Sequence, residues 1–505
     1  MPNFNHLFSS PRAISMALSA LKMLKMLLGL VVMWLSMRYF GLSVERDAWV
    51  IAVGGLGVLL LSLYSPINDT FRTRFVFLRE QKGEAETVKA AVALVCLVFV
   101  SLLIVSALIA SLREYVAKAL APGFSGGDLL LVSAMLIGLL PFFVFEQTNN
   151  LFKALLNTYD SFFYPELMGL VASVVNILFI ILFSSAIGIW SLVLASAVNT
   201  ISLTLVLYAQ LKKRIPLFAF LPLPSLKEAV PFLTFSLPVW LATFAMQFYL
   251  LLERAVCSKM TEGAVSAIDY ARQVMNLPFL VFMSVIPTVL TPLLAKHFVR
   301  NEMEEYANAL RGFVRVLMVF TLLVGAVMIA VPDRVSMFFF HYADVSFVQA
   351  MRTFGVAIFF VILSLILGQT LISQDRVINY VIGTVAGNAF SVAWCLAFHD
   401  SISSVALAYC LGQVIQTVVL FFCLGVVSKR ALMADLAKLL CCGALGGLLL
   451  MKMDGFFPNE LSQQTTFCVL ALEGIVLFLI VGSFFLAFFP SERKGILSKF
   501  CRTKD

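Results

Sequence analysis

The chain has 505 residues, of which 61% are hydrophobic and 13% charged, and its mean hydropathy is +0.98. Because soluble globular proteins have an apolar share nearer ~45–50%, this composition excludes a soluble globule and predicts an all-α polytopic membrane protein. The formal net charge of +8 falls in short loops between apolar segments, which indicates membrane topology rather than a nucleic-acid partner.

Windows of about 20 apolar residues predict about 14 transmembrane helices. In chain order they lie near residues 14–39, 47–67, 88–111, 129–152, 163–185, 189–211, 230–252, 264–295, 309–331, 350–372, 377–398, 402–427, 436–453 and 466–489. The first span is a full-length helix that contains Lys22 and Lys25. We therefore expect no cleavable signal peptide.

Lysine and arginine are concentrated in alternate loops. The basic loops and the tail contain Arg72, Arg74, Arg79, Lys82, Lys212, Lys213, Arg214, Lys296, Arg300, Lys429, Arg430, Arg493, Lys494, Lys499, Arg502 and Lys504. The positive-inside rule places these segments in the cytoplasm. We expect a multi-pass protein of the bacterial cytoplasmic (inner) membrane, with both termini cytoplasmic.

The two halves of the chain are loosely similar. Val44-Glu-Arg-Asp-Ala opens the second span, and Val265-Ser-Ala-Ile-Asp opens the eighth, roughly 220 residues later. Six spans per repeat is an even number, so the repeats are predicted to be parallel. The predicted parts are an N-lobe at 1–211, a cytoplasmic linker at 212–229, a C-lobe at 230–428, and a final helix pair with a basic tail at 429–505. The two six-helix lobes are expected to surround a central cavity.

The eighth span carries charges and prolines that lipid does not tolerate well. It contains Asp269 and Arg272, three residues apart, and is interrupted by Pro278, Pro287 and Pro292. Such a span is expected to face protein or a water-filled cavity. Arg272 is a candidate cavity cation, and the alternative is a structural ion pair with Asp269.

Three further groups of charges are candidates for function. Lys22 and Lys25, one turn apart in the first span, are predicted either to bind a diphosphate or to extend to the cytoplasmic interface. Arg38, Arg46 and Asp47 lie at the outer ends of the first two spans. They are predicted to form an outer gate, and the alternative is that they are solvated loop charges. Glu146 in the fourth span is a candidate site for a coupling ion, Na⁺ or H⁺; the alternative is a hydrogen bond between helices.

Motifs for catalysis and for nucleotide binding are missing from the sequence. It contains no Gly-x-x-x-x-Gly-Lys-Ser/Thr, no His-Glu-x-x-His and no Cys-x-x-Cys, and the nine cysteines have no metal-ligand spacing. We therefore predict a secondary transporter, with no enzymatic activity, no catalytic residue, no metal site and no cofactor beyond a coupling cation.

Several stretches carry a family resemblance that covers essentially the whole chain. They are Tyr39-Phe-Gly-Leu-Ser-Val-Glu-Arg-Asp-Ala-Trp, Leu120-Ala-Pro-Gly-Phe, Leu155-Leu-Asn-Thr-Tyr-Asp-Ser-Phe-Phe-Tyr-Pro, Gly263-Ala-Val-Ser-Ala-Ile-Asp-Tyr-Ala with Leu277-Pro278, and Ser373-Gln-Asp. The sequence resembles the lipid II flippase (MurJ/MviN) branch of the multidrug/oligosaccharidyl-lipid/polysaccharide (MOP) exporter superfamily. The resemblance implies alternating access and a polyprenyl-diphosphate sugar as substrate.

The sequence departs from that family where its cavity cations usually lie. The first span has Lys22 and Lys25 instead of arginines, and the eighth reads Tyr270-Ala-Arg-Gln-Val instead of Tyr-Ala-Asp-Arg-Leu. The expected cargo is therefore lipid II or another lipid-linked glycan. Two alternatives stay open, a drug or cation antiporter of the same superfamily and a membrane glycan ligase or polymerase. The expected partners are the glycan lipid and membrane lipids, with the protein a monomer near envelope glycan synthesis enzymes.

Overall fold

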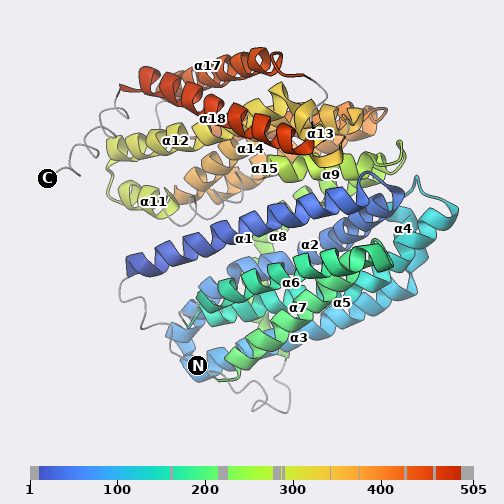
Figure 1. Cartoon of the computed structure of the whole chain (residues 1–505). Helices are drawn as coiled ribbons and strands as arrows, with labels where there is room; N and C mark the ends of the chain where they lie inside the picture. The colour runs from blue at the N-terminus through green and yellow to red at the C-terminus, as the bar shows by residue number, and fades with distance from the viewer. Residues whose placement is uncertain are drawn as a thin grey trace. The chain divides into compact units, whose positions relative to one another are not determined.

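A computed structural model describes the chain except for residues 1–10, 160–162, 214–225, 277–285, 287–289, 342, 375, 426–428, 459–461 and 491–505. Over the described ranges the regular structure is helical, with no strand (Figure 1). The fold class predicted from composition is confirmed.

Twelve helices in the described residues are long and apolar enough to cross a membrane. Each coincides with one of the predicted spans. The two other predicted spans fall on α8 (Leu226–Cys257) and on the segment from α9 (Ala264–Met275) to α11 (Thr291–Val299), which lies partly outside the described residues. The predicted total of about 14 spans is thus an approximate count.

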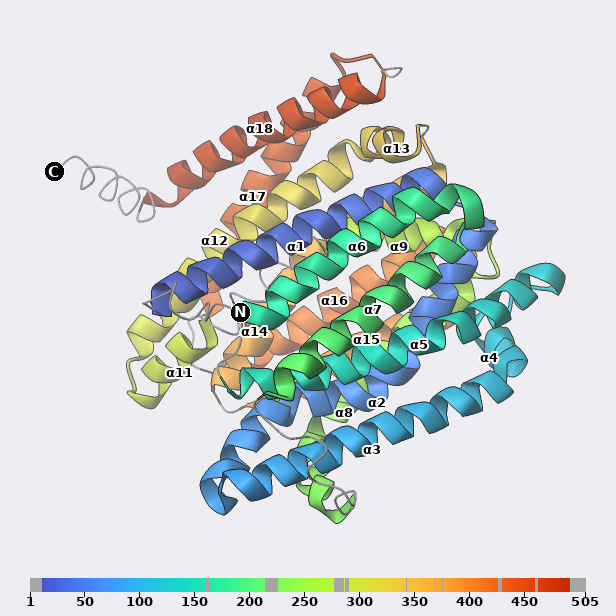
Figure 2. The ribbon, with the colours of Figure 1, turned by 60° about the horizontal axis from the view of Figure 1, so that its bottom comes forward.

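The chain forms two compact units, Met1–Ser266 and Ala267–Asp505. In the first unit, α2 packs against α5 and α8, α5 against α7, and α1 against α6 (Figure 2). Its helices before α8 are α1 (Pro11–Phe40), α2 (Val44–Lys82), α3 (Glu84–Ser111), α4 (Arg113–Leu120), α5 (Gly126–Asn157), α6 (Phe163–Ile187) and α7 (Trp190–Leu211).

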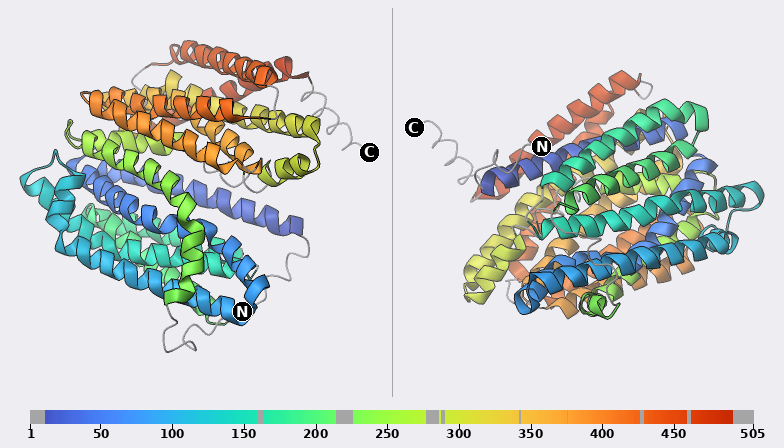
Figure 3. Two further views of the ribbon diagram at one scale, coloured as in Figure 1. Left: turned by 180° about the vertical axis from the view of Figure 1, so that it is seen from behind. Right: turned by 90° about the horizontal axis from the view of Figure 1, so that it is seen from below.

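Helix α8 packs in the first unit, although we predicted that it belongs to the second lobe. We assigned the segment from residue 230 onward to the second lobe, whereas α8 packs along α2 and α3 inside the first unit (Figure 3). Residues 214–225 of the predicted linker lie outside the described residues. The boundary at 212–229 therefore stays a prediction.

In the second unit, α14 packs between α12 and α16, and α15 packs on α16. Its helices after α11 are α12 (Met303–Ala330), α13 (Pro332–Phe340), α14 (Val345–Ser373), α15 (Val377–Ala397), α16 (Ile402–Cys423), α17 (Lys429–Asp454) and α18 (Gln463–Phe488). Helices α12 and α14 cross closely at two glycines. A Cβ atom on Gly325 of α12 would lie 2.8 Å from the carbonyl oxygen of Gly355 on α14. Small residues of this kind let membrane helices approach closely.

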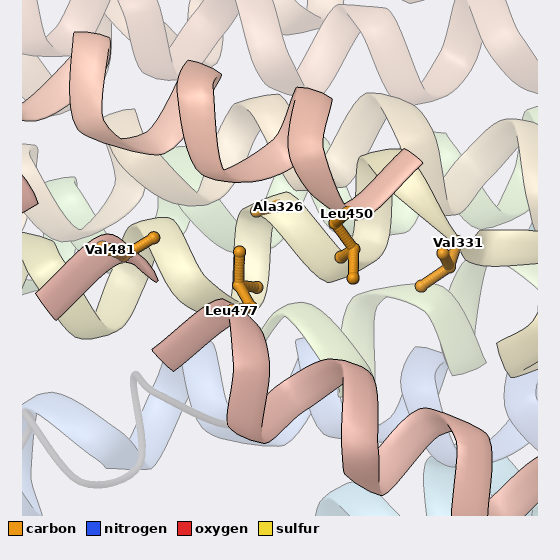
Figure 4. Close-up of a cluster of buried hydrophobic side chains, with 5 residues drawn as sticks. All are labelled: Ala326, Val331, Leu450, Leu477 and Val481. Atoms are coloured by element: carbon orange, nitrogen blue, oxygen red, sulfur yellow. The ribbon is translucent and has the colours of Figure 1, made fainter. Parts of the chain in front are cut away.

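The last two helices pack onto α12 through apolar side chains. Ala326 and Val331 contact Leu450 of α17 and Leu477 and Val481 of α18 in one buried cluster (Figure 4). A Cβ atom on Gly446 of α17 would lie 2.7 Å from the Val481 side chain, so the two helices cross closely there.

Candidate functional site

Arg272 lies on α9 in the second unit, beside two aromatic rings. Its guanidinium carbon is 5.0 Å from the centre of the Phe354 ring on α14 and 4.5 Å from that of Tyr409 on α16. The side chain is half-buried. Cation–π contacts of this kind favour a guanidinium by about 0.5–2 kcal/mol each, more where water is excluded. The two rings therefore give this charge a favourable contact inside the second unit.

Asp269 precedes Arg272 by one helical turn. Its Oδ2 accepts a hydrogen bond of 2.7 Å from Nε2 of Gln273. The neighbouring Tyr270 is fully buried, with its ring 5.9 Å from that of Phe340. The sequence reading missed Gln273, although its spacing of four residues from Asp269 is that of side chains that meet on a helix.

Asp47 binds the N-terminus of α9, although it belongs to the first turn of α2. Its Oδ2 accepts a hydrogen bond from the backbone N–H of Gly263 at 2.8 Å, and its Oδ1 accepts one from Ser266 at 2.7 Å. The side chain is 2% exposed. A carboxylate in this position satisfies free N–H groups and interacts favourably with the helix dipole.

The contact between these two helix starts is reciprocal. Oε1 of Glu262, just before α9, accepts a hydrogen bond of 3.3 Å from the backbone N–H of Val44, the first residue of α2. Gly263 has φ of 82°, and a Cβ atom there would lie 2.8 Å from Cβ of Leu42. Only glycine fits this close approach without strain. We call these contacts between residues 42–47 and 262–266 the α2–α9 latch.

The two arginines predicted at the outer gate lie in different surroundings. Arg46 is 2% exposed, and its guanidinium lies 4.3 Å from the centre of the Trp49 ring. Arg38 is exposed and lies 5.2 Å from the Trp34 ring on its own helix. In the described part of the chain Arg38 forms no ion pair with Asp47. Burial of Arg46 and Asp47 rules out the solvated-loop alternative for these two residues.

A second group of charges lies in the first unit. The Lys25 ammonium lies against Gly169 of α6, where an added Cβ would be 3.2 Å from Nζ. Lys153 of α5 interacts electrostatically with Lys25, Glu146 and Glu166. The sequence reading missed Lys153, which follows Glu146 by two helical turns and so shares its helix face. The Lys22 side chain lies outside the described residues.

The predicted site residues thus fall into separate groups. Lys25 and Glu146 belong to the first unit, and Asp269 and Arg272 to the second. Within the described residues no group of three or more His, Cys, Asp and Glu side chains is placed to hold a metal ion.

Comparison with known proteins identifies the family. A family model described as lipid II flippase MurJ matches residues 37–472. A lipid II flippase MurJ of Burkholderia cenocepacia is 26% identical over 334 residues, which is 64% of this chain and 63% of that protein. The matched region therefore spans less than two thirds of that relative.

Two solved structures share the fold at lower identity. An inward closed conformation of the lipid II flippase MurJ has a TM-score of 0.77 and 18% identity, over 94% of this chain and 99% of that chain. An inward-facing multidrug resistance MATE family transporter of the MOP superfamily has a TM-score of 0.66 and 14% identity, over 83% and 95%. These structures share the fold, and the family model, which matches most of the chain, shows that this chain belongs to the lipid II flippase MurJ family.

Proposed function

We propose that this protein translocates a polyprenyl-diphosphate-linked glycan, lipid II or another cell-envelope precursor, from the inner to the outer leaflet of the bacterial cytoplasmic membrane. Family membership supports this activity. The observation that carries it is Arg272, a cation held beside Phe354 and Tyr409, which lie on two helices long and apolar enough to cross a membrane. An intramembrane cation is costly and usually functional, and a diphosphate is the anion that such a substrate supplies.

The diphosphate is assigned to Arg272 with the Lys22 and Lys25 pair, and Asp269 is assigned to the same cavity. Charge-assisted hydrogen bonds to phosphate are among the stronger contacts in proteins. Two features support the assignment, the Lys25 ammonium next to Gly169 and the electrostatic interaction of Lys25 with Lys153. Two neighbouring ammonium groups repel each other, and an anion that binds both of them relieves this repulsion.

The α2–α9 latch is proposed to act as the outer gate of an alternating-access cycle. The latch joins two helix N-termini through hydrogen bonds from backbone N–H groups to the carboxylates of Asp47 and Glu262, so it can break and reform without a covalent change. Asp47 supplies acceptor oxygens, and the positive charge of Arg46 partly offsets the negative charge of Asp47. Arg38 lies in the last turn of α1. Opening of the latch would free the first turn of α9, the helix that carries Arg272.

Transport is proposed to be driven by a gradient, with the lobes rocking about the 212–229 linker. The chain lacks a nucleotide-binding motif, and each unit charge moved across 100 mV supplies about 2.3 kcal/mol. Glu146 is the proposed site for a coupling Na⁺ or H⁺, with no other cofactor and no catalytic turnover. The protein is proposed to work as a monomer near envelope glycan synthesis enzymes, with both termini in the cytoplasm.

Reconstitution tests this function directly. The purified protein in liposomes that contain a fluorescent lipid-linked oligosaccharide should expose the label to an external quencher, faster under an inside-negative potential or an ion gradient. Empty liposomes and the Arg272→Ala variant serve as controls. A strict requirement for ATP, or label movement no faster than in empty liposomes, would refute the proposal.

A drug or cation antiporter is the second candidate, because the fold also matches a multidrug resistance MATE family transporter. The same liposomes decide between the two when loaded with a fluorescent organic cation. Cation exchange against a Na⁺ or H⁺ gradient, with no movement of the glycan lipid, would favour the antiporter.

A further inference from the structure

One arginine holds the turn that follows α17 in the second unit. Arg334 on α13 is buried, and its Nε donates a hydrogen bond to Oδ1 of Asp454, the last residue of α17. Its Nη2 donates to the carbonyl oxygens of Asp454 at 2.9 Å and of Phe457 at 3.1 Å, and its Nη1 donates to that of Pro458 at 3.3 Å. Arg334 thereby supplies donors at a helix end, where carbonyl groups lack partners within the helix. We call Arg334, Asp454, Phe457 and Pro458 the α13–α17 clasp.

Glu473 on α18 is a second carboxyl group beside the same guanidinium. Its Oε1 lies 3.8 Å from Nε of Arg334, which is beyond hydrogen-bond distance. Nε carries a single hydrogen, and that hydrogen is donated to Asp454. The Glu473 side chain is 1% exposed, and neither of its oxygens has a hydrogen-bond partner among the described residues. Asp454 therefore neutralises Arg334, and Glu473 is left without a donor.

The other charges on the helices that pack against α18 do not offset Glu473. These helices are α12, α13 and α17. On α13, Asp333 pairs with Arg352 at the surface, at 3.0 Å. On α17, Lys452 is exposed, and the remaining charged residues of α12 and α17 lie in the first halves of these helices. Within the described part of the chain, Arg334 is the one cation placed within 4.0 Å of the Glu473 carboxyl group.

The helix face that carries Glu473 is otherwise apolar. Leu470 precedes it by three residues and Leu477 follows it by four, which places both on the same face of α18. Leu477 packs with Ala326 and Leu450 in the buried cluster of Figure 4, and Leu470 packs against that cluster. An ionised carboxylate that accepts no hydrogen bond is strongly disfavoured in such an environment. The geometry therefore favours a cation bound to Glu473.

The surroundings of Glu473 suit a proton better than a metal ion. Hard metal cations need a shell of several oxygen ligands. In the described ranges no group of three or more His, Cys, Asp and Glu side chains is placed to hold a metal ion, and the carbonyl oxygens of Phe457 and Pro458 accept hydrogen bonds from Arg334. A proton needs one carboxylate oxygen and no further ligand.

We propose that Glu473 is a proton-binding site of the last helix pair, and that its proton keeps the α13–α17 clasp closed. With the proton bound, Glu473 is neutral and Arg334 pairs with Asp454. When the proton leaves to water, Glu473 becomes a second anion beside Arg334 and competes with Asp454 for the guanidinium, which loosens the turn between α17 and α18. The site uses none of the residues assigned to transport and does not depend on the proposed function.

Carbodiimide labelling tests for the proton, because dicyclohexylcarbodiimide reacts with protonated carboxyl groups in apolar surroundings and not with carboxylates. The full-length protein in detergent is treated with the reagent at neutral pH, digested and analysed by peptide mass spectrometry. Glu473 should be modified. The matched control in the same protein is Asp435, which is 3% exposed and accepts a hydrogen bond from Arg311 at 2.7 Å, and it should stay unmodified.

The Glu473→Gln variant separates a bound proton from a structural ion pair, because glutamine has the size of the protonated side chain and no charge. Its melting temperature in detergent at neutral pH should equal that of wild type. Arg334→Gln removes the donors of the clasp and should melt at a lower temperature. In the proposed site the folded protein holds a proton that the unfolded chain releases, so stability decreases as the pH rises. The wild-type melting temperature should therefore fall more steeply with rising pH than that of Glu473→Gln.

Three results would overturn the proposal. The first is a melting temperature of Glu473→Gln as low as that of Arg334→Gln at neutral pH, because an ion pair would then explain the site. The second is unlabelled Glu473 together with an infrared spectrum of wild type that has no protonated carboxyl band absent from Glu473→Gln; the spectrum requires no reagent to reach the site. The third is a melting temperature that depends on Na⁺ in wild type and not in Glu473→Gln, which would assign a metal cation instead of a proton.

Discussion

At the level of single side chains, Arg272 combines a charge with two aromatic rings, Phe354 and Tyr409, which meet edge to face. Arg272→Ala should abolish export of the glycan lipid at normal protein levels, because the proposed phosphate contact is lost. Arg272→Lys keeps the charge but loses the planar contact with Phe354 and Tyr409, so we expect it to retain partial export. Export is measured by complementation together with immunoblotting.

The control for this experiment is Arg352→Ala in the same unit. Arg352 is exposed and pairs with the exposed Asp333 at 3.0 Å, and such surface pairs contribute about 0–1 kcal/mol. Its export should equal that of wild type. Full export by a double variant with Arg272→Ala and Lys25→Ala would refute the diphosphate assignment.

Asp47 gives a second prediction at the residue scale. Asp47→Ala leaves the N–H groups of Gly263 and Ser266 without their acceptor, and the loss of such a buried partner costs about 1–3 kcal/mol. We expect a lower melting temperature in a thermal unfolding assay in detergent. Glu45→Ala changes an exposed carboxylate in the same helix turn and should leave the melting temperature unchanged; equal effects of both variants would contradict the role of the α2–α9 latch.

Among the elements, α12 and α14 depend on the crossing at Gly325 and Gly355. Gly325→Val should force the helices apart, because the new Cβ would lie 2.8 Å from the Gly355 carbonyl oxygen, and overpacking of this kind costs typically about 1–3 kcal/mol. The measurement is melting temperature and yield of monodisperse protein. Gly312→Val on the same helix meets nothing within 4 Å and controls for helix propensity; similar losses in both would show that the crossing is not limiting.

For the whole molecule, alternation of basic and base-poor loops predicts the topology. A reporter fused after Arg214, Arg430 or Lys504 should be cytoplasmic, and one fused near Gly126 or Gly455 should be on the outer side, because translocation of lysine and arginine is disfavoured. Paired fusions to alkaline phosphatase and to green fluorescent protein report on which side of the membrane each fusion point lies. An outer location for a fusion after Lys504 would overturn the orientation.

The sequence by itself determined the class of protein, the positions of twelve spans and the family, because hydropathy over about 20 residues and short motifs are local properties of the chain. It also singled out Asp47 and Arg272, since charges stand out in apolar surroundings. Only the tertiary structure decided what these charges contact. Asp47 meets Ser266 across 219 positions, and Arg311 meets Asp435 across 124. Such pairs depend on which helix faces pack together, and packing of faces is a property of the whole fold that no local pattern encodes.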